Sequence, residues 1–148
     1  MMPKKITKTK FPFRYTAGLS AKDRKRQLRS LKKAKRNYKT KRGIKRYVAR
    51  PKLKSFKSKK SGWTQKFHKL YPEANTMRQI ADQTGIPLKA LMAVKKKGMG
   101  AYYSSGSRPN QTAESWGKAR MYSYILGGPT RKIDHHITQE YNVKFKHR

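Results

Sequence analysis

The chain has 148 residues, no cysteine and a formal net charge of +34, from 40 Lys and Arg against 6 Asp and Glu. Without cysteine, a disulfide framework and a thiolate metal site are excluded. No apolar run approaches the roughly 18 to 20 residues that span a bilayer, and no apolar stretch follows the basic N-terminus as a secretory signal requires. A charge this large predicts a polyanionic partner.

The charge is spread unevenly and divides the chain into regions. Residues 1–72 hold 27 Lys and Arg and a single acid, a net charge of +26, whereas residues 73–148 hold 13 Lys and Arg and five acids, a net charge of +8. Self-repulsion in the first region outweighs the burial that its scattered apolar residues supply. We therefore predict a mainly α protein: a long, largely extended basic N-terminal arm (1–72) with one helix, a small helical domain (73–134) and a basic C-terminal tail (135–148).

The first motif along the chain is KTKFPFRYT, residues 8–16. Pro12 restrains the residue before it to an extended backbone. Phe11, Phe13 and Tyr15 then recur with the period of two that places side chains on one side of an extended chain. Such a strip suits docking into a groove of another protein. The alternative, that these aromatic side chains fold back onto the protein's own core, stays open.

A helix is predicted over residues 20–39. Ser20 is the expected N-cap, and Asp23 follows in a capping-box position with its charge near the helix N-terminus. The apolar stripe is thin and the other positions are mostly Lys and Arg, so contact with phosphates or an acidic surface should stabilise the helix. A basic helix that is merely solvated is the alternative. The expected polyanion-binding residues are Lys25, Arg26, Arg29, Lys32, Lys33, Lys35 and Arg36.

From Gly43, which ends the helical pattern, to Pro72 the sequence is typical of an extended basic arm. It combines many Lys and Arg with isolated aromatic residues, among them Phe56 and Trp63. Arg and aromatic side chains together stack on bases or cover apolar patches of proteins. We expect Phe56 and Trp63 to dock onto a partner.

The segment NTMRQIADQTGIPLKALMAVKKKG, residues 75–98, has the layout of a helix-turn-helix. Ala81 lets two helices approach and Gly85 supplies the turn. Pro87 stands in the first turn of the second helix, where its missing N–H does no harm. The apolar residues that would close a small core are Met77, Ile80, Ile86, Leu91 and Val94.

The outward positions of the second helix in this pair are chiefly Lys89, Ala90 and Ala93. A helix that reads bases presents Arg, Asn, Gln, Ser or Thr to the base edges. The helix pair is therefore expected to serve a structural or nonspecific role rather than to recognise a defined DNA sequence, which is the less favoured alternative.

The stretch GAYYSSGSRPNQTAESWGKAR, residues 100–120, is aromatic and nearly charge-balanced. Gly98, Gly100 and Gly106 permit tight turns, and Thr112 is the expected N-cap of a helix that Gly127 and the residues after it end. We therefore predict a specific loop between two helices. Its expected protein-docking residues are Tyr102, Tyr103, Arg108 and Trp116.

Two further patterns suggest chemistry only weakly. Lys95, Lys96 and Lys97 beside the glycine-rich loop are expected to bind a polyanion, yet the spacing of a P-loop is absent. The run Asp134-His135-His136 is more typical of a satisfied helix terminus than of a metal or acid–base centre, because adjacent side chains point in different directions. No catalytic, metal-binding or cofactor-binding residue is predicted.

Two motifs carry a family resemblance: RPKLKSFKSKKSGW, residues 50–63, and GAYYSSGSRPNQTAESWGKARMYSYILGG, residues 100–128. Together they resemble a family of small basic proteins of large icosahedral DNA viruses, the algal chloroviruses and their giant-virus relatives. A shorter version of the second motif is similar to a domain of tailed-phage proteins. The resemblance extends from about Phe11 to Ile137.

The resemblance implies a virion structural protein, most directly a minor capsid protein that braces the inside of an icosahedral capsid. Its expected partners are the major capsid protein and other minor capsid proteins, with genomic DNA or the anionic surface of an inner membrane as further partners and no small-molecule substrate. It would lie beneath the capsid shell after synthesis in the host cell. Two alternatives stay open: a nonspecific DNA-condensing protein packaged with the genome, and a ribosomal protein.

Overall fold

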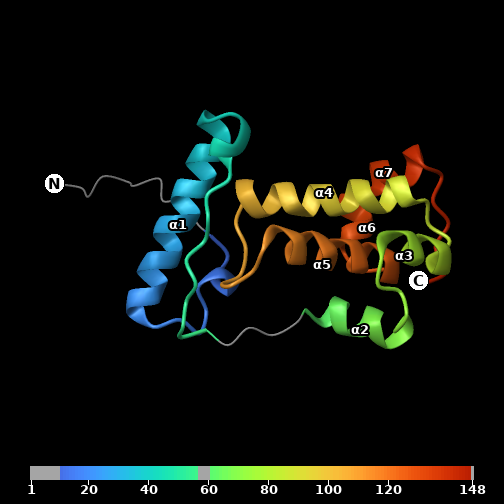
Figure 1. The fold of residues 1–148 in the computed structure, drawn as a ribbon, viewed down its shortest axis with the longest axis horizontal. Helices are drawn as coiled ribbons and strands as arrows, with labels where there is room; N and C mark the ends of the chain where they lie inside the picture. Colours follow the sequence, from blue (N-terminus) through green and yellow to red (C-terminus); the bar gives the residue numbers. More distant parts are fainter. Residues whose placement is uncertain (1–10, 57–60, 148) are drawn as a thin grey trace. The chain divides into compact units, whose positions relative to one another are not determined.

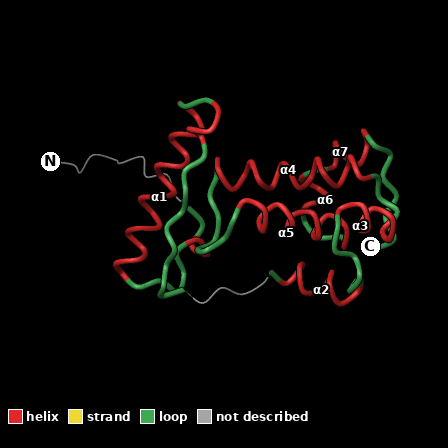
Figure 2. Tube along the Cα trace, in the orientation of Figure 1, coloured by secondary structure: helices red, strands yellow, loops and turns green. Residues whose placement is uncertain are grey.

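A computed structural model describes residues 11–56 and 61–147, and within these ranges the chain forms helices and loops without any strand (Figures 1 and 2). The predicted mainly α class is confirmed. The chain divides into two compact units: an N-terminal unit, Met1–Lys57 with Tyr103–Asn110, and a helical unit, Ser58–Tyr102 with Gln111–Arg148. Residues 1–10, 57–60 and 148 of the predicted arm and tail lie outside the described residues.

The N-terminal unit is organised around one long helix, α1 (Ala21–Thr40), which lies within one residue of the predicted range. Two short 3-10 helices flank it, η1 (Phe13–Tyr15) and η2 (Gly43–Arg46). Ser20 is the N-cap as predicted, since its hydroxyl accepts a hydrogen bond from the backbone N–H of Asp23. The helix therefore begins at the N-cap that the sequence predicts, although half of its residues are Lys or Arg.

The carboxylate of Asp23 does not complete the predicted capping box. It accepts hydrogen bonds from the backbone N–H and the hydroxyl of Ser55, and the Ser55 hydroxyl in turn accepts from the backbone N–H of Ser20. A segment more than 30 positions along the chain thus takes the role that a local capping partner would have. The residues after η2 return to the start of α1.

The small core of the N-terminal unit is closed by the loop Tyr103–Asn110, which we call the SSGSRPN loop. At Gly106 the backbone has a φ of +104°, and a Cβ there would lie 3.0 Å from Cδ2 of Leu31 and 3.2 Å from Cε2 of Tyr15. Only glycine fits this approach without strain. The buried apolar side chains of the unit are Tyr15, Leu19, Leu31, Ala34 and Leu53.

Side-chain hydrogen bonds hold the SSGSRPN loop in this position. Asn110 bonds both backbone groups of Leu53, accepting from its N–H at 2.8 Å and donating to its carbonyl at 2.9 Å. The buried Gln27 donates from Nε2 to the carbonyls of Tyr15 and Ser107 at 3.2 and 3.3 Å. The loop predicted between two helices therefore belongs to the basic N-terminal unit.

These contacts differ from the expectation of a largely extended arm over residues 1–72. Residues 11–56 pack into one unit together with the SSGSRPN loop. The loop supplies apolar surface and hydrogen-bond partners that the basic segment lacks. A helix, α2 (Gly62–Leu70), also replaces predicted extended chain, with Ser61 as its N-cap. Trp63 and Phe67 are one helical turn apart there, and Phe67 is fully buried, so burial of this face stabilises the helix.

The helical unit contains α2 and five further helices: α3 (Met77–Thr84), α4 (Leu88–Ser104), α5 (Ala113–Leu126), α6 (Thr130–Ile133) and α7 (His135–Glu140). Its core is larger and more apolar than that of the N-terminal unit, with Phe67, Leu91, Val94, Met121 and Tyr124 all fully buried. The ring of Phe67 stacks on that of Tyr122 with centroids 4.4 Å apart, which joins α2 to α5.

The two helices predicted around Gly85 are α3 and α4. Gly85 ends α3 in the left-handed conformation with a φ of +73°, and α4 begins directly after Pro87. Ile80, Ile86, Leu91 and Val94 are buried as expected, whereas Met77 is half-buried. Ala90, expected to face outward, is fully buried and belongs to the apolar core of the helical unit.

Helices α4 and α5 lie side by side in the helical unit (Figure 1) and approach closely at two glycines. A Cβ on Gly98 would lie 2.7 Å from Cα of Gly117, and a Cβ on Gly117 would lie 2.7 Å from the carbonyl oxygen of Lys95. The prediction of turns at Gly98 and Gly100 is therefore corrected, since both lie inside α4. Gly98 serves helix packing rather than chain reversal.

The described part of the predicted C-terminal tail packs against the helical unit. Ile137 and Val143 are buried, and the ring of Phe145 meets that of Tyr124 edge-on at 5.0 Å between centroids. The guanidinium of Arg131 lies 3.7 Å from the centroid of the Phe145 ring and donates to the carbonyl of His147. These apolar and cation–π contacts explain why residues 135–147 do not form a free basic tail.

Candidate polyanion-binding surface

One face of α1 is a line of exposed cations. Spacings of three and four residues place side chains on the same side of a helix. The opposite side, which includes Gln27, Leu31 and Ala34, is buried in the N-terminal unit. The cations that follow this spacing are Lys22, Arg26, Arg29, Lys33 and Arg36, and all five are exposed. We call these five residues the α1 cation line.

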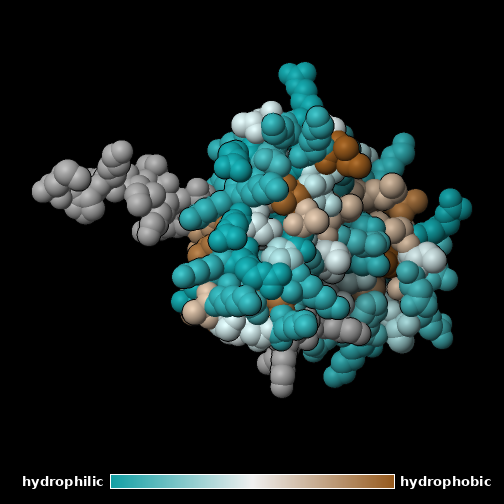
Figure 3. Space-filling model, turned by 60° about the vertical axis from the view of Figure 1, so that its left-hand side comes forward, coloured by the Kyte–Doolittle hydropathy of each residue, from teal (hydrophilic) through white to brown (hydrophobic). Residues whose placement is uncertain are grey.

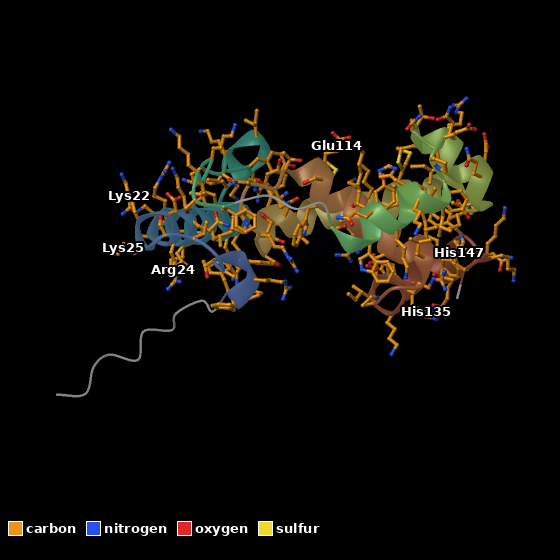
Figure 4. The ribbon with its side chains drawn as sticks, turned by 90° about the horizontal axis from the view of Figure 1, so that it is seen from below. Lys22, Arg24, Lys25, Glu114, His135 and His147 are labelled. Atoms are coloured by element: carbon orange, nitrogen blue, oxygen red, sulfur yellow. The ribbon has the colours of Figure 1, made fainter. Side chains whose placement is uncertain are left out.

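The α1 cation line is long enough to contact several phosphates. Its first and last members are 14 positions apart, so at 1.5 Å per residue it extends over about 21 Å. Figure 4 shows Lys22, Arg24 and Lys25 extending outward from α1, and hydrophilic side chains cover much of the face drawn in Figure 3. Lys25 and Lys32, also exposed, flank the line.

The charge of this surface is almost uncompensated, because Asp23 is the only acidic residue before Glu73. The hydrogen bonds from the hydroxyl and the backbone N–H of Ser55, assisted by the charge of Arg26, lower the pKa of Asp23 below its ordinary value of 3.8. Its Oδ1 lies 3.6 Å from Nη1 of Arg26. Asp23 is thus held in the first turn of α1, and the other members of the α1 cation line, Lys22, Arg29, Lys33 and Arg36, are exposed.

The second predicted polyanion-binding group lies on the other unit. Lys95, Lys96 and Lys97 are on α4, and Lys96 and Lys97 are exposed. Lys95 is half-buried, with Nζ 3.3 Å from Oε1 of Glu114. The hydrogen bond from Lys95 and the charge of Lys118 lower the pKa of Glu114. One of these three lysines is therefore already paired within the helical unit.

The predicted docking residues of the N-terminal unit differ in exposure. Tyr15 is buried. This agrees with the alternative stated above, in which the aromatic side chain packs onto the protein's own core rather than onto a partner. Phe11 and Phe56 are half-buried, and Nζ of Lys35, a predicted polyanion-binding residue, lies 5.9 Å from the centroid of the Phe11 ring. Phe13 is 79% exposed.

Tyr103 and Arg108 are the docking residues predicted on the SSGSRPN loop. Arg108 is exposed, and Tyr103 is half-buried. The ring of Tyr103 meets that of Tyr47 with centroids 4.4 Å apart. Tyr103 thus packs within the N-terminal unit, while Arg108 is available to solvent.

In the helical unit the predicted docking residues take part in internal packing. The hydroxyl of Tyr102 donates to the carbonyl of Gln111 at 2.9 Å, and this tyrosine is buried. Trp63 lies against Gly128, where a Cβ would come within 2.7 Å of its ring, and Trp116 is half-buried. Packing within the helical unit therefore covers part of the surface of these aromatic side chains.

The run Asp134-His135-His136 is a structural feature in the described residues. Asp134 is fully buried and accepts from Nε and Nη2 of Arg120 at 2.8 and 2.6 Å, whereas both histidines are exposed. Within the described ranges no three His, Cys, Asp or Glu side chains cluster as metal ligands. None of the helices described there is long and apolar enough to cross a membrane.

Two kinds of surface residue were not predicted from the sequence. Lys22 belongs to the α1 cation line, and its position four residues before Arg26 was the signal that could have identified it. Ile44, which follows Gly43 at the start of η2, is 84% exposed. The α1 cation line can contact an extended anionic surface through several charged side chains.

Comparison with known protein families identifies the chain at the level of a family. The model of a family of unknown function, DUF5824, matches residues 12–142. This span includes α1, the SSGSRPN loop and the helices of the helical unit. No curated protein and no solved structure matches the chain. The protein therefore belongs to the DUF5824 family, whose function is not known.

Proposed function

We propose that the protein is a structural protein that binds the phosphate backbone of nucleic acid without sequence preference, through the α1 cation line. The observation that carries the proposal is a row of five solvent-accessible cations on one side of a helix whose other side is buried. A line of about 21 Å along a duplex passes several phosphates, because DNA carries one charge per about 1.7 Å of its axis.

The low exposure of most of the predicted docking aromatics supports nucleic acid, rather than a groove of another protein, as the main partner. A brace held by aromatic plugs needs exposed rings, but Tyr15 and Tyr102 are buried and most of the other predicted plugs are half-buried. The cations of α1 are accessible instead. A viral setting for this activity is part of the proposal, and it rests on the resemblance carried by the SSGSRPNQT motif.

We also propose a supporting role for α3 and α4, which have a helix-turn-helix-like layout. A helix that reads bases needs side chains that reach the base edges. Of the positions expected to face outward, Lys89 is exposed, Ala90 is buried and Ala93 is half-buried. This pair therefore lacks the polar side chains for base readout, and we assign it to the scaffold of the helical unit.

The test compares two triple variants with the same decrease in charge. In the first, Arg26, Arg29 and Lys33 are changed to Gln. In the control, three cations of the helical unit are changed to Gln, each of them exposed: Lys69, Lys132 and Lys144. Binding of a labelled mixed-sequence DNA duplex is followed by fluorescence anisotropy over a range of salt concentrations.

We expect the α1 variant to decrease the magnitude of the negative slope of log K against log salt by about 0.9 for each phosphate that is no longer neutralised, about 2.7 in total. The control should change the slope much less, because its cations lie outside the proposed surface. An equal decrease in both variants would show that binding depends on net charge alone and would refute the assignment to α1.

A minor capsid protein that braces the shell is the second candidate, and one observation favours it. Phe13 and Ile44 are 79% and 84% exposed in the same basic unit, and exposed large apolar side chains among cations suit an acidic protein surface with apolar pockets. Cross-linking with mass spectrometry on intact virus particles that contain the protein tests it. Cross-links from Lys45 to capsid proteins would support bracing, whereas retention with the genome after removal of the shell would contradict it.

A further inference from the structure

The solvent side of α4 forms an open apolar groove that the proposed function does not use. Its volume is about 430 Å³, and its floor is formed by Met77 of α3 with Met92 and Met99 of α4. Met92 is 54% exposed, whereas Leu91 and Val94 of the same helix are fully buried. The groove belongs entirely to the helical unit.

Lysines of α4 lie along one edge of this methionine floor. Lys89, Lys95 and Lys96 line the same groove. Along α4 the spacing of three and four residues places Lys89, Met92, Lys96 and Met99 on one side of the helix, opposite the buried Leu91 and Val94. The surface thus combines an apolar centre with a cationic rim.

We infer that this groove docks an acidic amphipathic helix of another protein. Apolar side chains spaced three and four apart on such a helix would cover the methionine floor, in the manner of other helix-in-groove complexes. Its carboxylates would lie next to the rim lysines. Methionine suits this role because its unbranched, polarizable side chain adapts to the shape of a partner.

Charge complementarity excludes the protein itself as the occupant. A second copy carries the same net charge of +34 and would be repelled. No segment of the chain supplies an acidic helix either, since its six acidic residues are scattered among 40 Lys and Arg. The occupant is therefore a different protein with an acid-rich amphipathic segment.

Nucleic acid fits this groove less well than it fits α1. Phosphates would satisfy the lysines but would leave the methionine floor uncovered, so the apolar surface would gain nothing from binding. This inference concerns the helical unit alone, and it is independent of DNA binding by α1.

Methionine methyl groups report directly on the groove. The chain has six methionines: Met1, Met2, Met77, Met92, Met99 and Met121. Three form the groove floor, and Met121 is fully buried in the core of the helical unit. Protein labelled with carbon-13 at the methionine methyls therefore carries three signals that should respond to docking and one internal reference.

The probe is a synthetic peptide of about 16 residues, somewhat over four helical turns, with Leu at helical spacing and Glu at the other positions. Its control has the same composition in a scrambled order without an apolar stripe. Titrations are made at about 0.15 M salt, which screens exposed charges over roughly 8 Å. We expect saturable shifts of the Met77, Met92 and Met99 signals with the patterned peptide only, and a constant Met121 signal.

A matched pair of variants distinguishes docking in the groove from nonspecific binding of the peptide. Met92→Gln removes an exposed floor residue and should weaken peptide binding about tenfold, as loss of one largely buried apolar side chain predicts. Leu70→Gln changes a residue of similar exposure, 51% against 54%, that does not line the groove, and it should leave binding unchanged. An unchanged Met121 signal checks that each variant is folded.

Two results would overturn the inference. Equal binding of the patterned and scrambled peptides, without movement of the three groove signals, would mean that charge alone attracts them. Larger shifts of the same signals with a short DNA duplex than with the patterned peptide would assign the groove to nucleic acid. Neither result depends on whether the α1 cation line binds DNA.

Discussion

Different interactions stabilise each of the two units of this protein. The helical unit buries large apolar side chains, such as Phe67, Leu91 and Met121. The N-terminal unit has a smaller core, and hydrogen bonds of Gln27 and Asn110 to backbone groups from other parts of the chain complete it. A strongly basic segment thus becomes compact when a loop from elsewhere in the chain, with Arg108 as its single charged residue, supplies hydrogen-bond partners for it.

This comparison predicts that damage to one unit can leave the other folded. Apolar burial contributes about 25 cal/mol for each Å² removed from water, so the stability of the helical unit is spread over many side chains. In the N-terminal unit a few hydrogen bonds of about 1 kcal/mol each carry a larger share. Substitutions in each unit test this difference.

Asp134→Ala should destabilise the helical unit by about 3 to 5 kcal/mol, because it leaves the guanidinium of Arg120 without its buried partner. In the native protein the carboxylate is fully buried and bound through both oxygens. Urea unfolding followed through the reference signal of Met121 measures the change. The exposed Glu140→Ala is the control, and an effect below about 1 kcal/mol in Asp134→Ala would contradict the importance of this ion pair.

Gly117→Ala should destabilise the helical unit by about 1 to 3 kcal/mol through overpacking. The added methyl would meet the carbonyl oxygen of Lys95 at 2.7 Å and Cγ of Met99 at 2.9 Å, so α4 and α5 would have to separate. Gly62→Ala is the matched control, because nothing lies within 4 Å of its added Cβ. Equal stabilities of the two variants would show that the helices can move apart without cost.

Asn110→Ala should destabilise the N-terminal unit alone, by about 1 to 2 kcal/mol, because it removes hydrogen bonds to both backbone groups of Leu53. Hydrogen exchange should become faster in α1 and stay unchanged in α5. Asn110→Gly is a useful second variant, since Asn110 has a φ of +59° that glycine adopts without strain. If exchange in α5 accelerates equally, the two units unfold together and the comparison fails.

Acidification should destabilise the N-terminal unit through protonation of Asp23. Because Ser55 lowers the pKa of Asp23 below 3.8 in the folded protein, ionised Asp23 stabilises the fold above its unfolded-state pKa of about 3.9. That contribution disappears as the pH falls through the lowered pKa. Asp23→Asn should remove this part of the pH dependence, measured as hydrogen exchange in α1 between about pH 5 and 2.5.

Local features of the fold could be predicted from the sequence. Ser20 and Thr112 were predicted as N-caps, and both hydroxyls accept the expected backbone hydrogen bonds. Gly85 was predicted at a turn and has a positive φ. Each of these depends on a few neighbouring residues, which is why the local rules are sufficient.

Long-range features could not be predicted in the same way. Asn110 and Leu53 are 57 positions apart, and nothing in either segment indicates that they pair. Helix α2 was missed because its basic context resembles an arm, although Trp63 and Phe67 have helical spacing. At Gly98 the local interpretation as a turn is overridden by the close approach to Gly117, which only the packed helices reveal.

The candidate site shows the same division between local and long-range features. The cations of α1 were selected from helical spacing and charge, both of which are local. Whether an aromatic residue is available to a partner depends on tertiary packing, so Phe13 could not be distinguished from Tyr15, its neighbour at period two, which is buried. The methionine groove was not predicted, since Met77 was assigned to the core of a helix pair.

The position of the SSGSRPN loop has a consequence for fragments of this protein. Because the N-terminal unit takes Tyr103–Asn110 from between α4 and α5, the chain leaves that unit, returns to it and leaves it again. A fragment that ends near residue 57 would therefore lack Asn110 and Gly106, and with them the closure of its core. The helical unit made without residues 1–57 would present a loop whose anchoring partners are gone, so neither piece can be removed by a single cut without leaving the other incomplete.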